Sequence, residues 1–544
     1  MPDSDPMTNG GGAPPEATFD AVIVGAGFAG MYMLHRLRGE GFSVTVLEAA
    51  DGVGGTWYWN RYPGARCDVE SMQYSFQFDE ALQQEWAWTE RYATQPEILR
   101  YANHVADRFD LRRDIQFETR VTAARFDEDA NRWAIETSAG ARLSARFCIM
   151  ATGCLSSPNT PDFDGIDSFA GETYHTGLWP HEGVDFTGQS VGVIGTGSSA
   201  IQSIPLIAEQ ATHLTVFQRT PHYTVPAHNQ PLEREMVRQI KAHYSDYRAQ
   251  ARAVPPAVLF PVNEDGAVEV SAEERQRVYE QRWAVGGVMF MGSFNDLLFS
   301  AEANESAAAF VRTKISEAVP DPEIAELLSP HTVIGCKRLC VDTDYYATYC
   351  RPNVSLVDVR DTPIEALTPS GIRVGDREYP FDSIVFATGF DAMTGALLNI
   401  DIRGREGRKL KDKWYGGPRT YLGLGVEGFP NLFTITGPGS PSVLANMIVA
   451  IEQHVDWIVD CLRHLRDNGL TCIEATREAE DAWVAHVNEV ADGNLRSTCS
   501  SWYVGANIPG KPRLFMPYIG GFPVYAEKCE VAAAKGYDGF SLSE

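Results

Sequence analysis

The stretch Gly54–Asp68 (GGTWYWNRYPGARCD) combines residue types that point to a binding pocket. Tryptophan and tyrosine side chains stand between glycines and a proline, and two arginines and one aspartate share the same span. Aromatic side chains at this density build flat, partly dry pocket walls. The pair Gly54-Gly55 allows a ligand or another backbone segment to approach closely. On this stretch alone, a packed aromatic loop inside the core is an equally good interpretation.

A glycine-rich turn precedes this stretch, within a complete strand–helix–strand unit. The apolar run Ala21–Val24 predicts a buried parallel strand, and Gly25–Gly30 (GAGFAG) opens a helix. A second strand, Val44–Leu47, ends at the carboxylate of Glu48. In such a unit the glycines admit a pyrophosphate to the helix N-terminus, and the acid accepts hydrogen bonds from a ribose. The alternative, a plain glycine-rich turn, has less support.

The same unit occurs a second time with a different ending. The strand Val191–Ile194 leads into Gly195–Ala200 (GTGSSA), and His213–Gln218 is the second strand. Gln218 stands where the first unit has its acid, and Arg219 follows. A 2′-phosphate would be repelled by an acid and held by a guanidinium, so this unit suits NADP. A chain with both units is most economically a flavoprotein that binds FAD and is reduced by NADPH.

The rest of the chain fits an α/β fold with two Rossmann-like dinucleotide-binding domains and a helical insertion in the NADP domain. Two apolar strands end in Ala-Thr-Gly, at 151–153 and 387–389, where such flavoproteins return the chain between domains. Charged, helix-favouring runs cover Leu232–Ala251 and Ser271–Arg282. The predicted order is a disordered N-terminus (1–18), the FAD domain in two parts (19–155 and 390–544), the NADP domain in two parts (156–225 and 331–389) and the insertion (226–330).

The composition excludes several classes of partner. The chain has 544 residues and a net charge of −26, which disfavours binding to nucleic acid or anionic membranes. Its apolar runs are too short to span a bilayer, and the N-terminus lacks the features of a signal peptide. Ten scattered cysteines without a CxxC pair indicate reduced thiols. We therefore expect a cytoplasmic protein that is a monomer or a weak oligomer.

Two longer motifs make the chain resemble the Baeyer–Villiger monooxygenases. Phe169–Pro180 (FAGETYHTGLWP) matches the signature FxGxxxHxxxW[PD], and Gly54–Asp68 matches [AG]GxWxxxx[FY]P[GM]xxxD. The segments RYPGARCDVES, GPGSPSVLANM and SWYVGANIPGKPRLFMP are most similar to the phenylacetone and steroid monooxygenase branch. The resemblance runs from about residue 19 to the C-terminus. It implies tightly bound FAD, NADPH as electron donor, O₂ and a ketone as substrates, and an ester or lactone as product.

The resemblance also implies roles for individual residues. A peroxide on flavin C4a must stay anionic to attack a carbonyl, so a permanent cation beside it is required. Arg338 matches the catalytic arginine of the family, Asp68 would orient it, and Lys337 matches a residue at the phosphate end of NADP. From the residues alone, Arg338 reads as a surface cation paired with Asp342 or Asp344.

Further site residues follow from the same resemblance, and no metal site is expected. The signature His175 is expected to be structural rather than a general base, and Trp179 to be packing. Small and apolar pocket residues suit a bulky, apolar ketone, although Cys154 departs from the phenylacetone type. The FAD site would comprise Gly25, Gly27, Phe28, Ala29, Glu48, Gly55, Thr56, Trp57, Asp68, Tyr74, Val121 and Met447. The NADP site would comprise Thr196, Gly197, Ser198, Ser199, Gln202, Arg219, Thr220, Lys337, Arg338 and Trp502. The substrate pocket would comprise Val69, Cys154, Leu155, Ser442, Val443, Leu444 and Met447.

Three other functions remain open at this point. A flavin monooxygenase that oxidises amines or sulfides shares both dinucleotide units, but its signature ends differently. A disulfide reductase requires CxxxxC just after the second strand of the FAD unit, and only Cys67 lies in that region. A nucleotide-sensing flavoprotein without activity is disfavoured by the presence of Arg338 and Asp68.

Overall fold

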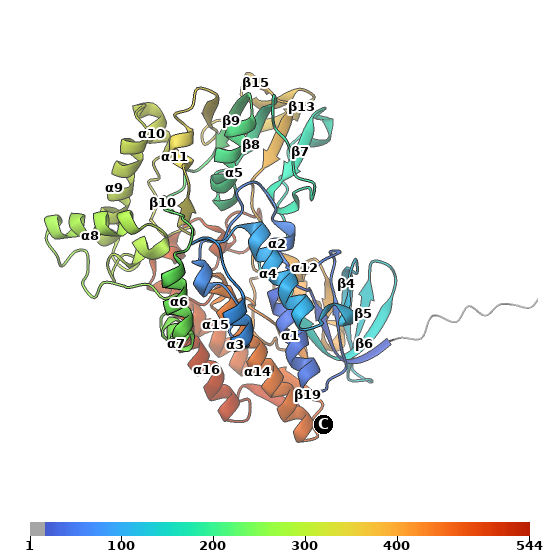
Figure 1. Cartoon of the computed structure of the whole chain (residues 1–544). Helices are drawn as coiled ribbons and strands as arrows, with labels where there is room; N and C mark the ends of the chain where they lie inside the picture. Colours follow the sequence, from blue (N-terminus) through green and yellow to red (C-terminus); the bar gives the residue numbers. More distant parts are fainter. Residues whose placement is uncertain (1–16) are drawn as a thin grey trace, which may run out of the picture.

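The computed structural model describes residues 17–544, which fold around two β-sheets whose central strands run parallel (Figure 1). The predicted disordered N-terminus falls mainly on residues 1–16, which lie outside the described range. Its last two residues, Ala17 and Thr18, instead begin strand β1 (Ala17–Val24) and pair with Leu143 and Ser144 of β6 (Arg142–Met150). The predicted boundary is therefore wrong by two residues.

Eight strands of the described chain form the first sheet, in the order β17-β4-β5-β6-β1-β2-β3, with β18 pairing with β6 beside this path. β5 is antiparallel to both neighbours, and the remaining pairs are parallel. β17 and β18 come from the C-terminal third of the chain, so N-terminal and C-terminal segments both contribute strands to this sheet. The further bounds are β2 (Val44–Leu47), β3 (Ile115–Gln116), β4 (Val121–Asp127), β5 (Arg132–Thr137), β17 (Asp401–Arg403) and β18 (Leu432–Thr434).

The first glycine-rich unit has the predicted order of strand, helix and strand. Helix α1 (Phe28–Gly39) begins directly after Gly27, and β2 ends one residue before Glu48. Residues 21–24 of β1 are all buried, as expected for a central parallel strand covered on both faces. α1 packs with α14 (Met447–Asp467) in the largest hydrophobic core of the molecule.

The second sheet contains five parallel strands in the described residues, in the order β12-β9-β8-β16-β7, and lies at the top of Figure 1. Helix α5 (Ser198–Gln210) connects β8 to β9 and completes the second predicted unit. The Ala-Thr-Gly segments follow β6 and β16, as predicted. The strands of this sheet are β7 (Glu172–His175), β8 (Ser190–Ile194), β9 (His213–Gln218), β12 (Val354–Asp358) and β16 (Ser383–Phe386). A separate small antiparallel sheet consists of β13 (Ile364–Thr368), β14 (Gly371–Val374) and β15 (Arg377–Pro380).

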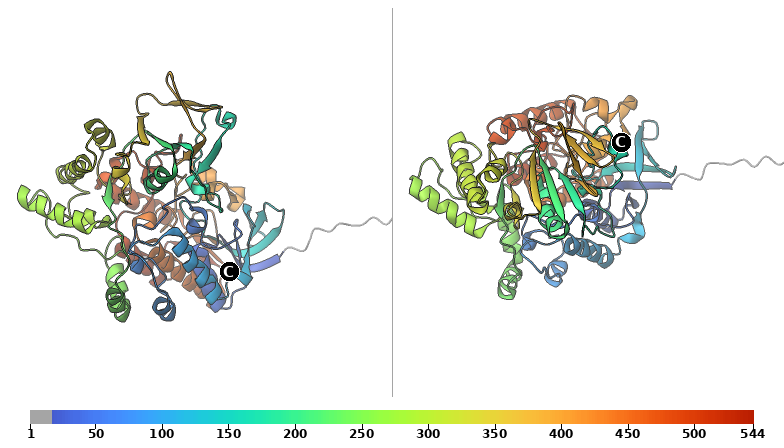
Figure 2. Two further views of the ribbon diagram at one scale, coloured as in Figure 1. Left: turned by 45° about the horizontal axis from the view of Figure 1, so that its top comes forward. Right: turned by 90° about the horizontal axis from the view of Figure 1, so that it is seen from above.

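A group of helices projects to one side of both sheets, as the views in Figures 1 and 2 agree. It lies between β10 (Thr224–Pro226) and β11 (Cys340–Asp342), which pair with each other at its base. The run Leu232–Ala251, read as one helical stretch, is two helices, because His243 leaves the helical conformation at φ −128° and ψ 33°. The helices are α6 (Arg234–Ala242), α7 (Tyr244–Arg252), α8 (Ala272–Val285), α9 (Ala301–Ala318) and α10 (Pro322–Leu328).

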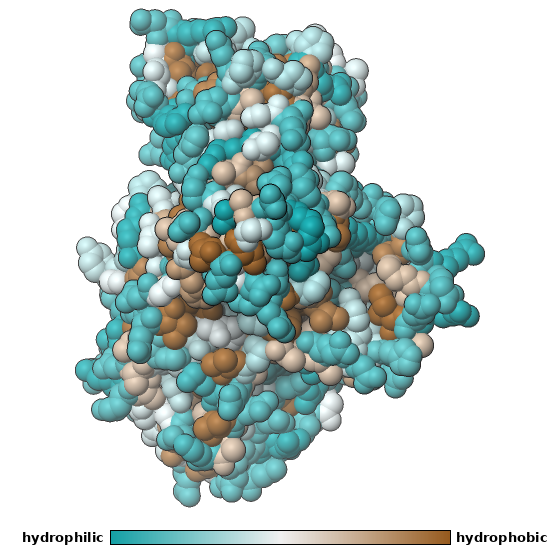
Figure 3. Space-filling model, turned by 90° about the vertical axis from the view of Figure 1, so that its left-hand side faces the viewer, coloured by the Kyte–Doolittle hydropathy of each residue, from teal (hydrophilic) through white to brown (hydrophobic). Residues whose placement is uncertain are grey.

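The face that carries these helices is mainly hydrophilic, with small groups of hydrophobic residues between the polar ones (Figure 3). Exposed hydrophobic side chains of this region are Met236, Val262, Val268, Val285 and Phe299.

The C-terminal segment covers the first sheet with α14, α15 (Arg477–Asp492) and α16 (Phe522–Ala534). Asn446 caps α14 by accepting the N–H of Ile448. No helix within residues 17–544 is long and apolar enough to cross a membrane. The remaining bounds are α2 (Thr56–Trp59), α3 (Glu80–Glu85), α4 (Gln95–Arg108), α11 (Tyr345–Thr348), α12 (Gly395–Leu398), α13 (Leu410–Lys413), β19 (Cys472–Ala475) and β20 (Phe540–Ser543).

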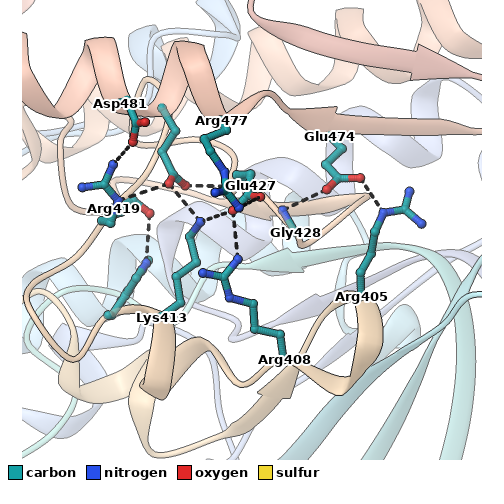
Figure 4. A network of polar contacts seen from close by, with 11 residues as sticks. Arg405, Arg408, Lys413, Arg419, Glu427, Gly428, Glu474, Arg477 and Asp481 are labelled. Carbon is teal, nitrogen blue, oxygen red and sulfur yellow. Dashed lines mark hydrogen bonds and ion pairs between the residues drawn. The ribbon is translucent and has the colours of Figure 1, made fainter.

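A network of ion pairs fastens the returning segment 405–428 to the region around α15 (Figure 4). Its centre is Lys413, whose Nζ lies 2.6 Å from Glu427 and 2.9 Å from Glu480. Lys413 and Glu480 are only 3% and 2% exposed, so each charge depends on the other for compensation. Arg408 and Arg477 approach Glu427 from more exposed positions.

Replacing Lys413 by Met tests this network. Removal of one partner from a buried ion pair costs about 3–5 kcal/mol, and without Lys413 the buried Glu480 would keep only its 3.4 Å contact with Arg419 as a salt bridge within residues 17–544. We expect a clear fall in the thermal unfolding temperature, measured by circular dichroism. Arg477→Ala is the control, since Arg477 is 66% exposed and such surface pairs contribute about 0–1 kcal/mol. Equal shifts for the two variants would contradict a buried centre at Lys413.

The network also predicts that the stability of the fold depends on pH. Burial raises the pKa of Glu427, but the hydrogen bonds and charges of Lys413 and Arg477 outweigh it and bring the pKa to about 2. Because the pKa of Glu427 is lower in the folded protein than its ordinary value of 4.5, the ionised carboxylate stabilises the fold above about pH 4.5. This stabilisation is lost as the pH falls toward 2.

Candidate functional site

A single large cavity, about 2040 Å³ in volume, lies at the carboxyl ends of the parallel strands of both sheets. It is lined by Gly25 and Glu48 of the first unit, by Gly195 and Arg219 of the second, and by much of the stretch Gly54–Asp68. Ligands of open α/β sheets bind at this edge, where the strands end and helices begin. The stretch read as a possible core loop therefore forms a cavity wall.

The first glycine unit has the features of a phosphate site. Within residues 17–544, no side chain caps the N-terminus of α1 and its first turn has no acidic residue, so its N–H groups are free for an anion. Gly30 must be glycine, because a Cβ there would lie 1.8 Å from the carbonyl oxygen of Gly25. The buried Glu48 accepts the N–H groups of Ala26 and Ala50 at 2.6 and 2.8 Å, which fixes its carboxylate at the cavity. Burial raises the pKa of Glu48, and these hydrogen bonds oppose that rise.

The second unit repeats this geometry. α5 also lacks a capping side chain and an acid in its first turn. In the described part of the chain, no atom lies within 4 Å of the position that a Cβ of Gly197 would take, so this glycine keeps space open at the cavity. Ala200, in place of the third glycine, is completely buried. The unit therefore also offers a free helix N-terminus to a phosphate.

Two cations line the cavity near this second unit. Neither Arg219 nor Lys337 forms a salt bridge within residues 17–544. Burial lowers the pKa of Lys337, and the charge of Arg219 lowers it further. Two cations at one cavity without a carboxylate partner repel each other, and a phosphate dianion would remove that repulsion. The first unit has a carboxylate, Glu48, at the corresponding place.

The segment Tyr62–Asp68 is docked on helix α5 of the second unit. Tyr62 donates its hydroxyl to Gln202 Oε1 at 2.8 Å, and Gln202 Nε2 donates to the carbonyl of Arg66 at 3.1 Å. Gly64 has φ +78°, and a Cβ there would lie 2.3 Å from the carbonyl oxygen of Gln202. Gln202 was expected to contact NADP; it lies at the cavity, but its side-chain amide is engaged by the Tyr62–Asp68 segment. The signature thus holds the two units together.

Asp68, at the end of this segment, forms a bidentate ion pair with Arg338. Arg338 donates Nε and Nη2 to the two carboxylate oxygens, the latter at 2.8 Å, and donates Nη1 to the carbonyl of Val443 at 2.8 Å. A guanidinium has five N–H groups, so two of them have no acceptor in the described residues. About a third of the Arg338 side chain is exposed, and the residue lines the cavity. The alternative partners Asp342 and Asp344 are not used.

Arg338 keeps its positive charge in this arrangement. Burial disfavours its charged form, but the charge of Asp68 and the hydrogen bonds to it outweigh that effect and raise the pKa of Arg338 above its ordinary value. The guanidinium therefore stays positive at any pH at which the protein is folded.

The remaining predicted residues lie at the cavity with two exceptions. All predicted FAD and NADP residues line it, including Trp502, as do Val69, Cys154, Leu155, Val443 and Met447. Ser442 and Leu444 do not line it: Ser442 is buried with its hydroxyl directed at Met393, and Leu444 packs into the adjoining hydrophobic cluster. The reason is that residues 442–444 form one 3₁₀ turn, in which successive side chains point about 120° apart.

His175 and Trp179 lie away from the cavity wall. The Nδ1 of His175 accepts the N–H of Gly177 at 3.0 Å, and its Nε2 lies 3.2 Å from the hydroxyl of Thr388. Burial lowers the pKa of His175. Trp179 is buried against Tyr174 and Phe186. These contacts are structural, in agreement with the expectation.

Some contacts of the site could not be predicted from the sequence. The carbonyl of Val443 holds Arg338 through backbone geometry alone, and any residue type supplies a carbonyl. The tie between Tyr62 and Gln202 joins residues 140 positions apart and becomes visible only in the fold.

Comparison with known proteins identifies the family. The model of a family described as pyridine nucleotide-disulphide oxidoreductase matches residues 22–285. An acetone monooxygenase (methyl acetate-forming) from Gordonia sp. strain TY-5 is 44% identical over 530 residues, 97% of this chain and 99% of the relative. A Baeyer–Villiger monooxygenase from Pseudooceanicola batsensis is 43% identical over 525 residues, 96% of each chain. The chain belongs to the Baeyer–Villiger monooxygenases. The solved structure of an oxidized steroid monooxygenase bound to NADP is 53% identical, with a TM-score of 0.93 over 97% of this chain and 100% of that chain.

The broad description of the matching family model does not make this Baeyer–Villiger monooxygenase a disulfide reductase. All ten cysteines are free. Cys67, the only cysteine between β2 and β6, is buried, and burial raises the pKa of its thiol. A redox-active dithiol beside the first cofactor site is therefore excluded.

Replacing Gly64 by Ala tests the docking of the signature segment. The new Cβ would strain a positive φ and meet the carbonyl oxygen of Gln202. Gly183→Ala is the matched control, because Gly183 has φ +79° and open space around its Cβ position. Positive φ costs about 1–2 kcal/mol in both variants, and we expect Gly64→Ala to lose at least a further 1 kcal/mol, measured by chemical unfolding. Equal losses would mean that the segment is not tightly docked on α5.

Proposed function

We propose that this chain oxidises a bulky, apolar ketone, with Arg338 as the catalytic cation and Asp68 as the residue that orients it. The protein is an FAD- and NADPH-dependent Baeyer–Villiger monooxygenase, which inserts one oxygen atom of O₂ beside a ketone carbonyl and forms an ester or lactone. The observation that carries the proposal is the bidentate pair of Arg338 and Asp68 in the wall of the cavity between both dinucleotide units.

The two units divide the cofactors between them. Glu48 and the free N-terminus of α1 support FAD in the first unit, since an acid accepts ribose hydroxyls and repels a 2′-phosphate. Arg219, Lys337 and the free N-terminus of α5 support NADPH in the second. With this assignment, residues 19–155 and 390–544 form the FAD domain, and 156–225 and 331–389 form the NADP domain.

Arg338 supplies the electrostatics of the oxygenation step. Bound FAD, once reduced by NADPH, supplies the activated oxygen. Attack on the ketone places negative charge on the carbonyl oxygen, and a fixed guanidinium with two free N–H groups stabilises that charge. Asp68 and the carbonyl of Val443 hold the guanidinium plane in place, so little reorganisation is needed when the charge develops.

The apolar end of the cavity supports the proposed substrate class. Cys154, Leu155, Val443 and Met447 lie together at this end and belong to one hydrophobic cluster with Trp502. Burial raises the pKa of Cys154 to about 11, so its thiol is neutral and acts as a small apolar group. A ketone with a sizeable apolar body fits such walls, with its carbonyl toward Arg338.

The proposed cellular location and oligomeric state are those expected from the sequence. Ten free thiols support the proposed cytoplasmic location. A monomer or weak oligomer remains the prediction for the assembly.

The proposal is tested by product identification. The FAD-containing enzyme is incubated with NADPH and ¹⁸O₂ and a panel of aryl, cyclic and steroid ketones, with a sulfide and a tertiary amine in parallel. We expect esters or lactones that carry one ¹⁸O atom, formed fastest from the bulky ketones. Exclusive formation of sulfoxide or N-oxide would contradict the assignment and favour a heteroatom-oxidising monooxygenase. Faster turnover of acetone than of any bulky ketone would contradict the substrate class alone.

Arg219→Ala tests the division of cofactors. Hydrogen bonds to charged groups contribute about 1.5–3 kcal/mol, so the loss should lower kcat/KM for NADPH by about 10- to 150-fold. NADH lacks the 2′-phosphate and should be used about as well as before, which makes it the internal control. An equal loss with both nucleotides would place the 2′-phosphate elsewhere.

Replacing either of two leucines in one hydrophobic cluster tests which residues line the substrate pocket. Leu155 lines the cavity and Leu444 does not. Leu155→Ala should therefore change the ranking of ketones, because each methylene in an apolar pocket is worth about 1–3 kcal/mol of discrimination. Leu444→Ala should lower stability and leave the ranking unchanged. A ranking altered only by Leu444→Ala would place the substrate on the other side of the 3₁₀ turn.

A further inference from the structure

A buried hydroxyl of the signature segment Phe169–Pro180 meets the first turn of α5. Thr176 Oγ1 lies 3.0 Å from the Oγ of Ser199. Thr176 is completely buried, whereas Ser199 is partly exposed and lines the cavity. The pair therefore joins the signature to the helix N-terminus of the second glycine unit.

The backbone around Thr176 is held in place by its neighbours. Thr176 directly follows β7, which pairs in parallel with β16 in the second sheet. The buried His175 accepts the N–H of Gly177 with its Nδ1 at 3.0 Å, across Thr176. A Cβ on Gly177 would lie 2.7 Å from the ring of Phe390, so this turn is tightly packed. The Thr176 hydroxyl thus has a fixed position beside α5.

Burial determines which of the two hydroxyls donates. Within residues 17–544, Ser199 is the only hydrogen-bond partner of the Thr176 side chain. Donation by Ser199 would leave the O–H of Thr176 buried without an acceptor, which is costly because that donor has lost its hydrogen bond to water. Donation by Thr176 satisfies its own proton and leaves the proton of Ser199 free for a ligand in the cavity. The second arrangement is therefore the favoured one.

The other two hydroxyl side chains of residues 196–199 have their protons engaged. Thr196 Oγ1 donates to the carbonyl of Thr220 at 2.8 Å. Ser198 Oγ lies 3.0 Å from the Sγ of Cys340, whose own S–H faces a backbone carbonyl at 3.5 Å, so Ser198 is the donor in that contact. Of these three hydroxyls, Ser199 is the one that keeps its proton for a ligand.

We propose that Thr176 is a positioning residue: it donates to Ser199 and thereby directs the Ser199 hydroxyl to the pyrophosphate of NADP at the N-terminus of α5. The inference rests on the proposed function, in which the second unit binds NADP. The O–H of Ser199 adds a donor to the free N–H groups of this helix end, which attract an anion. Because NADP and NAD share the pyrophosphate, the contribution of Thr176 is the same for both nucleotides, unlike that of Arg219.

The test measures binding of NADP⁺ to the FAD-containing Thr176→Val variant, followed by the change in flavin absorbance. Valine keeps the shape of threonine and lacks its hydroxyl. We expect the Kd for NADP⁺ and the KM for NADH to rise by a similar factor, about 3- to 10-fold. The rate of flavin reduction at saturating NADPH should stay unchanged, since the lost contact serves binding.

Two variants serve as controls. Thr176→Ser keeps the hydroxyl and should retain the affinity of the unmodified enzyme. Ser203→Ala removes another buried hydroxyl of α5, which donates to the carbonyl of Ala200 at 3.4 Å and does not line the cavity. It should leave the Kd for NADP⁺ unchanged.

A double-variant cycle with Ser199→Ala separates positioning from a general structural role. Ser199→Ala removes the donor itself and should weaken NADP⁺ binding at least as much as Thr176→Val. In the Ser199→Ala background, Thr176→Val should have no further effect, because Thr176 acts on the nucleotide only through Ser199. Where Thr176→Val loses bound FAD, Thr176→Ala replaces it. Unchanged NADP⁺ affinity in the Thr176 variant, or full additivity of the two changes, would overturn the inference.

Arg219→Ala distinguishes failure of this inference from failure of the cofactor assignment. If Arg219→Ala weakens NADP⁺ binding and Thr176→Val does not, the second unit binds NADP and Thr176 has no positioning role. If neither variant changes the affinity, NADP binds elsewhere and both proposals are wrong.

Discussion

The ion pair between Arg338 and Asp68 is the contact on which the site depends. A guanidinium is effectively always charged, so in a partly dry cavity a carboxylate must compensate that charge, and the guanidinium keeps its direction only if the carboxylate is fixed. Asp68 is fixed because the segment before it is docked on α5 through Tyr62 and Gly64. The pair joins the FAD-side signature to the segment that follows the helical insertion. A change in how the two units sit against each other would therefore move Arg338, and this physical link explains why the signature combines aromatic, glycine and acidic residues at fixed spacing.

We propose that a few charges give two units of the same architecture different cofactors. Both present an uncapped helix N-terminus at the carboxyl edge of a parallel sheet, which favours phosphate of any dinucleotide. In this proposal, Glu48 at the end of β2 and Arg219 after β9 distinguish a free ribose from a phosphorylated one. The distinction would be electrostatic and local, and it leaves the fold unchanged. Lys337 at the same cavity would add a second charge that a phosphate compensates.

Local patterns allowed much of the fold to be predicted from the sequence. β2, β8 and β9 were predicted to within one residue, and a helix was predicted after each glycine motif, because periodicity and glycine chemistry act over short distances. The break at His243 was not predicted, because the whole charged run Leu232–Ala251 was read as helix-favouring. The position of Arg338 depends on a partner 270 residues away, so its own neighbourhood suggested Asp342 or Asp344 instead. The family resemblance, rather than the residue pattern, led to the correct pair. Ser442 and Leu444 were placed in the pocket because sequence proximity to Val443 does not reveal the direction of a side chain in a 3₁₀ turn.

The most direct test of the Arg338 role is the amount of ester formed per NADPH consumed by Arg338→Ala, measured together with the rate of flavin reduction by stopped-flow absorbance. Removal of one preorganised electrostatic group costs about 10²–10³ in the rate of the step that it serves. The variant should therefore bind FAD and be reduced by NADPH, yet release hydrogen peroxide with almost no ester, and Arg338→Lys should recover little because an ammonium lacks the planar fork that Asp68 holds. Near-normal ester yield per NADPH in Arg338→Ala would show that the pair with Asp68 is only structural and that another cation at the cavity, such as Lys337, stabilises the developing charge.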